Sequence, residues 1–243
     1  MQALVNAGGK GTRMGRCGIE KPMQMVGDRP TVQRVLDALE GSAHIDEVFV
    51  SVSDNTLATE EYLQRRGVRT VRTSGESFMD DLHTAFEVMD GEYVLTCPSD
   101  LPLLTTAVVD SFIEYFRPGT MDSAIAVVDE PTVRRIGITP SYTVESRGRQ
   151  WVLSGVCIMN RPRTLQGEYL DEVFFETNWP ELAVNVNTMR ELDLARSFFR
   201  ERRRRPSPCG RLPPPSWPGR PRLSCPRTWR SPRPRSRRTR RPP

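Results

Sequence analysis

Apolar residues follow two alternating patterns along the first 200 residues. Short continuous apolar runs, which are typical of buried strands, lie at residues 3–7, 48–52, 68–71, 93–97, 124–128, 152–159 and 182–186. Between them, apolar residues recur at helical spacing in residues 32–39, 59–66, 79–89, 108–116 and 191–199. Strands separated by helical segments of this length predict an α/β fold, with a mostly parallel sheet and helices on both faces. The loops before the later strands are less regular, which fits an antiparallel insertion there.

The pattern stops near residue 200. Residues 202–243 consist mainly of Arg, Pro, Ser and Gly, and they show neither helical nor strand periodicity. Such a segment cannot bury enough apolar surface to offset the entropy lost on ordering. The sequence therefore predicts one folded domain over residues 1–200, followed by a disordered Arg/Pro-rich tail over residues 201–243.

Charge is divided between these two parts. Residues 202–243 hold 15 arginines and no acidic residue, so the rest of the chain carries 20 basic against 30 acidic side chains, a net charge of −10. A basic arm with Trp217 and Trp229 could neutralise phosphates and stack on bases. We favour a plain disordered extension, in keeping with out-of-frame translation of GC-rich codons, and we do not expect a nucleic-acid partner.

The remaining composition narrows the class of protein. No apolar run approaches the roughly 20 residues that span a bilayer, and the first residues lack the pattern of a signal peptide, so we expect no membrane partner and a cytoplasmic location. Five cysteines without CxxC spacing argue against a disulfide framework or a zinc site. With only two histidines, a His-rich metal centre is not expected either.

The strongest chemical motif directly follows the first predicted strand. It reads Ala7-Gly8-Gly9-Lys10-Gly11-Thr12-Arg13-Met14-Gly15 and continues in Glu20-Lys21-Pro22. Glycines let a backbone turn sharply and approach a phosphate, and consecutive N–H groups can bind an anion. The string matches neither the Walker pattern nor GxGxxG. We therefore expect a phosphate-binding loop of another kind, with positive charge from Arg13 and Lys21.

Lysine is used very selectively in this chain. There are 33 arginines but only two lysines, Lys10 and Lys21, and both lie in this motif. A lysine offers a compact ammonium, whereas arginine offers a broad planar guanidinium. The choice of lysine at these two positions suggests that the smaller group is required there.

The motif resembles the signature of the nucleotidyltransferases that activate sugar phosphates, molybdopterin and other phosphate monoesters. Within that superfamily the resemblance is greatest to the archaeal guanylyltransferases that act on adenosylcobinamide phosphate. It covers about residues 1–200 and extends in register through blocks at residues 73–82, 98–101, 153–156 and 184–188. The resemblance implies a single Rossmann-like nucleotidyltransferase domain, with Gly8, Gly9, Lys10, Gly11 and Thr12 around the nucleotide.

The resemblance also implies a magnesium site. Asp100 follows the strand at residues 93–97, so it should emerge at the carboxyl edge of the sheet, where ligands bind in open α/β folds. In related transferases the matching Asp holds Mg²⁺, assisted by an Asn that matches Asn187. Each residue could instead cap the helix that follows it.

Two further segments have both a functional and a structural interpretation. Ser74 and Gly75 end the third predicted strand, and by resemblance this region selects guanine, whereas Ser77 and Asp80 in the same segment would fit an ordinary helix cap. Gly155 lies inside an apolar strand, which indicates either a bulge or the close approach of a ligand. The resemblance places it in the active cleft.

The expected reaction is attack by an acceptor phosphate on the α-phosphorus of GTP, with pyrophosphate as the leaving group. Lys21 is assigned to the α-phosphate, Arg13 with the amides of residues 8–11 to the β- and γ-phosphates, and Asp100 to any magnesium. Adenosylcobinamide phosphate is the preferred acceptor, and a molybdenum-cofactor or sugar-phosphate transferase is the alternative. A nucleotide sensor without turnover would keep the loop but tolerate loss of Asp100. The sequence is also compatible with a homodimer.

Overall fold

The computed structural model describes residues 1–15, 18–140 and 142–204. All elements given below belong to one unit, Met1–Leu212, and the second unit, Pro213–Pro243, lies outside the described residues. The predicted disordered tail therefore falls almost wholly outside them, as do Trp217 and Trp229. The domain boundary at residue 200 stays a prediction. Among the described residues, no helix is both long and apolar enough to cross a bilayer.

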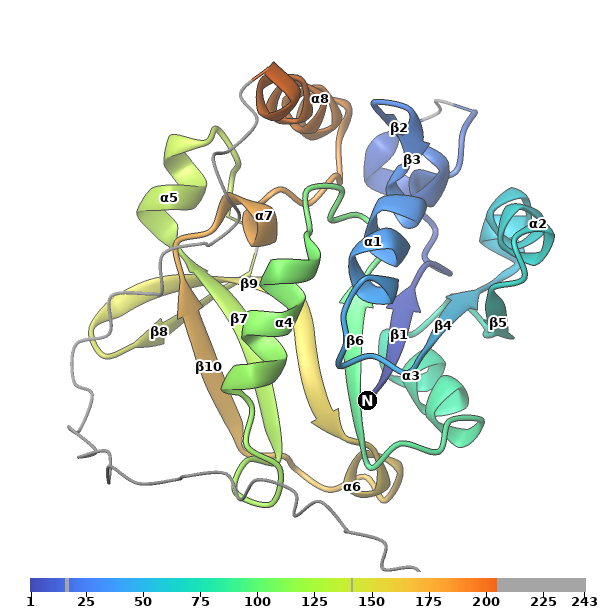
Figure 1. Ribbon diagram of the computed structural model, residues 1–243, viewed down its shortest axis with the longest axis vertical. Helices are drawn as coiled ribbons and strands as arrows, with labels where there is room; N and C mark the ends of the chain where they lie inside the picture. The colour runs from blue at the N-terminus through green and yellow to red at the C-terminus, as the bar shows by residue number, and fades with distance from the viewer. Residues whose placement is uncertain (16–17, 141, 205–243) are drawn as a thin grey trace, which may run out of the picture. The chain divides into compact units, whose positions relative to one another are not determined.

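Strands and helices alternate along most of the described chain (Figure 1). The strands are β1 (Gln2–Asn6), β2 (Met25–Val26), β3 (Arg29–Pro30), β4 (Glu47–Val52), β5 (Arg69–Arg72), β6 (Tyr93–Pro98), β7 (Ser123–Asp129), β8 (Thr143–Ser146), β9 (Arg149–Asn160) and β10 (Glu172–Thr177). The helices are α1 (Thr31–Glu40), α2 (Leu57–Arg65), α3 (Phe78–Glu87), α4 (Thr106–Tyr115), α5 (Glu130–Arg135), α6 (Arg161–Leu165), α7 (Pro180–Ala183) and α8 (Met189–Arg204).

The central sheet is mostly parallel, as the pattern predicted. Its strands follow the order β10-β7-β9-β6-β1-β4-β5, with β8 paired to β9 off this path. Strands β6, β1, β4 and β5 run parallel, and so do β7 and β10. Strand β9 is antiparallel to both β6 and β7 and joins the two groups. The expected antiparallel insertion is thus found in the second half of the fold.

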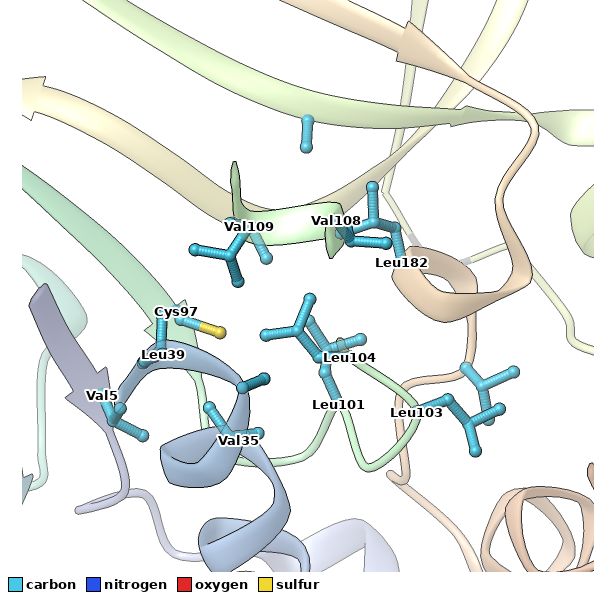
Figure 2. Close-up of a cluster of buried hydrophobic side chains, with 14 of the residues drawn as sticks. Val5, Val35, Leu39, Cys97, Leu101, Leu103, Leu104, Val108, Val109 and Leu182 are labelled. Atoms are coloured by element: carbon cyan, nitrogen blue, oxygen red, sulfur yellow. The ribbon is translucent and has the colours of Figure 1, made fainter. Parts of the chain in front are cut away.

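Helices cover both faces of the sheet because side chains alternate along each strand. Along β1, Ala3 and Val5 pack in the larger core with α1 and α4, while Leu4 packs on the other face with α3. Figure 2 shows Val5 and Cys97 from the strands facing Val35 and Leu39 of α1. The arrangement confirms the prediction of helices on both faces.

One predicted strand is wrong. The apolar run at residues 182–186 belongs partly to the short helix α7 and partly to the segment after it, and it joins no strand pair. Pro180 lies at the start of α7, where the missing N–H of proline costs nothing. Leu182 is buried in the larger core, so the run is apolar because it packs on the sheet. Periodicity alone does not distinguish these two cases.

Candidate active site

The carboxyl ends of β1 and β6 meet at one edge of the sheet. The N–H of Ser99 donates to the carbonyl of Asn6 across a distance of 3.1 Å, which joins the two segments as they leave the sheet. Beyond this edge lies a cavity of about 310 Å³. It is lined by the predicted residues Gly9, Lys10, Gly11, Thr12, Arg13, Lys21, Asp100 and Asn187. The structure thus brings most of the predicted site residues together.

The glycine-rich loop forms the part of the wall nearest to β1. Gly11 has a φ of 60°, a left-handed conformation that favours glycine, and it precedes a short 3₁₀ helix at Thr12–Met14. The N–H groups of residues 9–13 make no hydrogen bond with another described residue, and neither does the Arg13 guanidinium. Consecutive unpaired N–H groups beside a cation form an arrangement suited to binding phosphate.

Gly8 anchors this loop instead of lining the cavity. It is buried, and its carbonyl accepts a hydrogen bond of 2.6 Å from the Ser53 hydroxyl and one of 3.4 Å from the Asn55 amide. A Cβ at Gly8 would lie 3.3–3.4 Å from atoms of Val52, Ser53 and Thr73. Glycine at this position therefore allows close packing that fixes the start of the loop.

Lys21 lies at the centre of the polar cluster. Its ammonium forms an ion pair with the Oδ2 atom of Asp100 and donates a 2.8 Å hydrogen bond to the Oδ1 atom of Asn187. The Lys21 side chain is 19% exposed and that of Asp100 only 8%. Oxygens from two distant parts of the chain, Asp100 and Asn187, therefore converge on the Lys21 ammonium in the wall of the cavity.

Buried leucines hold Asp100 at this point. Leu101, Leu103 and Leu104 follow it directly and pack in the core near α4 and α7 (Figure 2). The Asp100 carbonyl in turn accepts a 2.9 Å hydrogen bond from the N–H of Val186, which brings the neighbouring Asn187 beside it.

The helix-cap interpretation is wrong for both Asp100 and Asn187. Thr105 caps α4, because its side chain accepts a hydrogen bond from the N–H of Val108. At the start of α8 the Thr188 hydroxyl accepts from the N–H of Glu191. The side chains of Asp100 and Asn187 are directed to Lys21 instead.

One oxygen of Asp100 has no hydrogen-bond partner among the described residues. Its Oδ1 atom is buried and makes no hydrogen bond within the described part of the chain. A buried carboxylate oxygen without a partner is costly, so the site favours a ligand that supplies a positive charge or a donor there. Carboxylate and amide oxygens are the ligands that Mg²⁺ prefers. Asp100 and Asn187 therefore fit the expected metal.

Ser74 and Gly75 lie beside the loop, outside the cavity lining. The Ser74 hydroxyl and the Gly75 N–H both donate to the Oδ1 atom of Asp81, at 2.9 and 3.0 Å. Ser77 caps α3, as the structural interpretation of this segment predicted. Gly75 has a φ of 70°, and a Cβ there would lie 2.7 Å from the Gly8 carbonyl oxygen. The segment thus buttresses the loop.

Lys10 has an acidic partner in the same segment. Its ammonium forms a 2.6 Å ion pair with Glu76, and both side chains are at least half exposed. Glu76 lies directly after Gly75, so the pair links the rim of the cavity to the segment between β5 and α3. Sequence reasoning missed this contact because the two residues are far apart in the chain.

Gly155 marks a bulge in β9. The register between β7 and β9 shifts between Ile125 and Val127, opposite Gly155, which has a φ of 81°. Gly155 is exposed, and a Cβ there would lie 3.3 Å from the Pro98 side chain, which lines the cavity. The structural interpretation is confirmed, and the residue lies close to the cavity without forming its wall.

Glu20, the residue before Lys21, makes contacts with α2 that sequence reasoning missed. Its carboxylate accepts hydrogen bonds of 2.7 Å from the N–H groups of Ala58 and Thr59, and one of 2.6 Å from the Thr59 hydroxyl. These N–H groups lie in the first turn of α2, where backbone donors lack partners within the helix. The contact ties the residue before Lys21 to a rigid helix.

Glu191 fixes the other side of the cluster. Its carboxylate accepts a 2.8 Å hydrogen bond from the N–H of Asn187. Thr188 and Glu191 have the spacing of a capping box, so the signal was present in the sequence. The Glu191 side chain also holds the backbone of Asn187 in place.

A second cavity of about 230 Å³ adjoins the first. The two share Arg13 and Asn187 in their linings. The second is lined mainly by apolar side chains of β7, β9 and α7, together with a few polar groups from residues 185–191. The cavities therefore meet at a cationic and an amide side chain.

Cys97, close to Asp100 in sequence, is not a reactive thiol. Burial raises the pKa of Cys97 well above its ordinary value, and the charge of Asp100 raises that pKa further. A protonated, buried thiol is a poor nucleophile. The chemistry of the site therefore rests on the lysine, carboxylate and amide groups and on the loop.

Comparison with known proteins is consistent with this geometry. The family of MobA-like NTP transferase domains matches residues 3–197. The adenosylcobinamide-phosphate guanylyltransferase of Methanocaldococcus jannaschii is 28% identical over 209 residues, which cover 83% of this chain and 98% of that protein. The "Probable molybdenum cofactor guanylyltransferase" of Thermococcus gammatolerans is 25% identical, over 79% of this chain and 97% of that protein.

Solved structures agree on the fold. A nucleotidyl transferase from Methanothermobacter thermautotroptrophicus has a TM-score of 0.62 at 18% identity, covering 82% of this chain and 97% of that one. CMP:2-keto-3-deoxy-manno-octonic acid synthetase, solved with CTP, has a TM-score of 0.62 at 14% identity, covering 82% and 98%. At these identities the likeness concerns the fold alone.

Proposed function

The chain belongs to the family of MobA-like NTP transferase domains and is a nucleotidyltransferase, and from that premise we propose that it transfers GMP from GTP to adenosylcobinamide phosphate. The products would be adenosylcobinamide-GDP and pyrophosphate, in the assembly of cobalamin. The length of the match to the Methanocaldococcus jannaschii guanylyltransferase supports this acceptor.

The observation that carries the proposal is the convergence of Lys21, Asp100 and Asn187 beside a loop whose N–H groups have no partner among the described residues. The loop and Arg13 would bind the β- and γ-phosphates, and Lys21 would stabilise charge on the α-phosphate as the new bond forms. The acceptor phosphate is largely a dianion at neutral pH, since its second pKa is about 6. It can attack the α-phosphorus without a general base, and alignment then supplies much of the rate.

Magnesium fits the two oxygens that face Lys21. We propose that Asp100 and Asn187 hold it, and that the bound ion would neutralise charge on the triphosphate. Asp100 can serve both cations, because its Oδ1 atom has no partner among the described residues while Oδ2 pairs with Lys21. Within this proposal, Lys21 exchanges its contact with Asp100 for one with the α-phosphate when GTP enters.

Guanine is proposed to lie near the segment between β5 and α3. The Gly75 N–H is committed to Asp81, so this residue and Ser74 support the loop and leave the base edge to neighbouring groups. Lys10 and Glu76 are exposed at this rim and offer a donor and an acceptor.

A molybdenum-cofactor guanylyltransferase is the second candidate. It is supported by the match to the Thermococcus gammatolerans protein, which covers nearly the whole of that relative. A sugar phosphate is a third acceptor class, because other nucleotidyltransferases with this fold act on sugars. The three proposals share GTP or another nucleoside triphosphate at the first cavity and differ in the acceptor.

The test uses GTP labelled at its α-phosphate, Mg²⁺ and each acceptor in turn. We expect label to move to adenosylcobinamide phosphate, with pyrophosphate released in equal amount and no transfer by Asp100→Asn. Transfer to molybdopterin or glucose 1-phosphate instead would overturn the proposed acceptor. Absence of transfer to all three, in protein whose thermal unfolding is cooperative, would overturn the proposed activity.

A further inference from the structure

The second cavity contains an unusual buried acceptor. Asn185 lies in the segment between α7 and α8 and lines this cavity. Its Nδ2 atom donates to the carbonyl of Ser154 at 3.4 Å, which fixes the orientation of the amide, because a carbonyl can only accept. Its Oδ1 atom is buried and has no hydrogen-bond partner within the described residues. A residue of the cavity wall thus holds one buried carbonyl oxygen that lacks a donor among the described residues.

The surroundings of this oxygen limit what can supply the donor. Val128, Val152 and Leu182 line the cavity and are at most 8% exposed. Apolar walls do not satisfy a ligand with hydroxyls on every carbon, because each buried hydroxyl requires its own partner. They suit a short, mostly apolar group that carries a single donor. At about 230 Å³ the cavity also admits an arm of a large acceptor and not a macrocycle.

The second cavity lies next to the first, where the acceptor phosphate must meet GTP. Arg13 and Asn187 border both cavities, so an acceptor whose phosphate enters the first cavity at this border can place its ester arm in the second cavity. Asn185, in the wall of the second cavity, then lies beside the group a few bonds beyond that phosphate.

We propose that Asn185 selects acceptors whose phosphate-bearing arm carries an amide N–H, which donates to its Oδ1 atom. This inference rests on the proposed function and adds a specificity-determining residue to it. In cobinamide phosphate the phosphate is an ester of an aminopropanol that is joined to the corrin ring through an amide. The geometry points to this amide and its apolar linker as the group bound in the second cavity, with the corrin ring outside.

The first test replaces Asn185 with leucine, which has nearly the same shape and no acceptor. For Asn185→Leu we expect KM for adenosylcobinamide phosphate to rise about tenfold, with the Kd for GTP unchanged by calorimetry. Asn178→Leu is the matched control, because Asn178 is exposed and lies outside both cavities. An unchanged KM in Asn185→Leu, or an equal rise in the control, would overturn the proposal.

A second test varies the acceptor and compares the wild-type enzyme with Asn185→Leu. Wild-type enzyme is given two small acceptors, N-acetyl-aminopropanol phosphate and its N-methylated amide, which lacks the N–H. We expect the first to have a kcat/KM at least tenfold higher and Asn185→Leu to lose this preference. Equal use of both by wild type overturns the inference and leaves the transferase proposal standing. Failure of GTP to bind or react with any acceptor, including adenosylcobinamide phosphate, overturns both.

Discussion

At the residue scale, Gly75 shows how a glycine outside the cavity can control the phosphate loop. A Cβ at this position would lie 2.5 Å from the Ser53 hydroxyl and 2.7 Å from the Gly8 carbonyl oxygen. Ser53 also donates to that carbonyl, so Gly75→Ala would push apart the contacts that anchor the loop. We expect at least about a tenfold rise in the Kd for GTP, measured by calorimetry, and a lower Tm.

The Gly67→Ala variant distinguishes the effect of this close contact from the effect of backbone strain alone. Gly67 has a φ of 71°, nearly that of Gly75, but a Cβ there meets nothing within 4 Å. Both variants place a side chain in the left-handed region, at a cost of about 1 kcal/mol. Only Gly75→Ala should weaken GTP binding. Equal Kd values for the two variants would show that the Gly8 carbonyl is not held in the way described.

Lys21 is the residue on which the chemistry depends most. Lys21→Ala removes the cation between Asp100 and Asn187 and the proposed contact with the α-phosphate. We expect kcat to fall about 100-fold or more, with cooperative unfolding retained. Near-normal turnover would refute its role.

Lys21→Arg tests whether the small ammonium matters. A guanidinium is broader and planar, whereas the compact Lys21 ammonium contacts an oxygen of Asp100 and one of Asn187 at once, so we expect activity close to that of Lys21→Ala. Recovery of at least half of the wild-type kcat, measured at saturating GTP, would show that charge alone suffices. The use of lysine at this position would then have no catalytic basis.

At the element scale, the loop depends on helix α2 as well as on the sheet. The Glu20 carboxylate caps the first turn of α2, and the positive end of a helix dipole favours such a charge. Glu20→Ala should cost about 1 kcal/mol of stability, as loss of a cap does. Because Lys21 follows directly, we expect kcat to fall by a larger factor than this stability loss explains.

The control for Glu20 is Glu61→Ala. Glu61 lies on α2, but its side chain is 69% exposed and, among the described residues, forms an ion pair only with Arg65 on the same helix. The Tm and kcat of this variant should stay close to wild type. If Glu20→Ala lowers the Tm and leaves kcat at saturating GTP unchanged, Glu20 supports the helix and does not position Lys21.

Glu47, on strand β4, makes the stability of the protein depend on pH. Glu47 on β4 contacts Gln2 on β1 and Arg69 on β5, and the hydrogen bond from Arg69 lowers the pKa of Glu47 below 4.5. The contribution of Glu47 to stability is therefore present above pH 4.5 and is lost as the pH falls through the lowered pKa. Glu47→Gln should reduce Tm at neutral pH, and the difference from wild type should shrink below pH 4.5. A constant difference across this range would contradict the assignment.

The elements were predicted well where one periodicity dominates. Strands such as β4 and β6 are continuous apolar runs, and α1 repeats its apolar residues on one face. The strand β10 was missed because its apolar run, between Glu172 and Glu176, is only three residues long. Residues 182–186 were misassigned because a buried helix and a strand share the same composition.

The site was predictable only in part, for a related reason. The loop motif is local, and Asp100 follows a strand, so both could be placed at the sheet edge from the sequence. The contacts of Asn187 with Lys21 and of Glu76 with Lys10 join positions that no spacing rule connects. Such pairs depend on how the strands are ordered in the sheet. Resemblance named Asn187, but only the structure shows what it touches.

At the scale of the whole molecule, function and charge are distributed differently along the chain. The described residues that line either cavity lie between Asn6 and Glu191 in the sequence, and the family match ends at residue 197. The 15 arginines of residues 202–243 nonetheless reverse the net charge of the chain, from −10 to +5. The tail therefore reverses the sign of the net charge, while all described residues that line the two cavities precede it in the sequence.

Removing residues 205–243 tests this division directly. We expect the shortened chain to keep its Tm, its Kd for GTP and its kcat, because every described element ends by Arg204. It should also change from binding a cation exchanger to binding an anion exchanger at neutral pH, since its net charge becomes negative. If full-length protein binds RNA with steep salt dependence, that binding should disappear with the tail. A loss of GTP affinity on truncation would instead mean that the arginines supply charge to the phosphate site, and the domain boundary near residue 200 would be wrong.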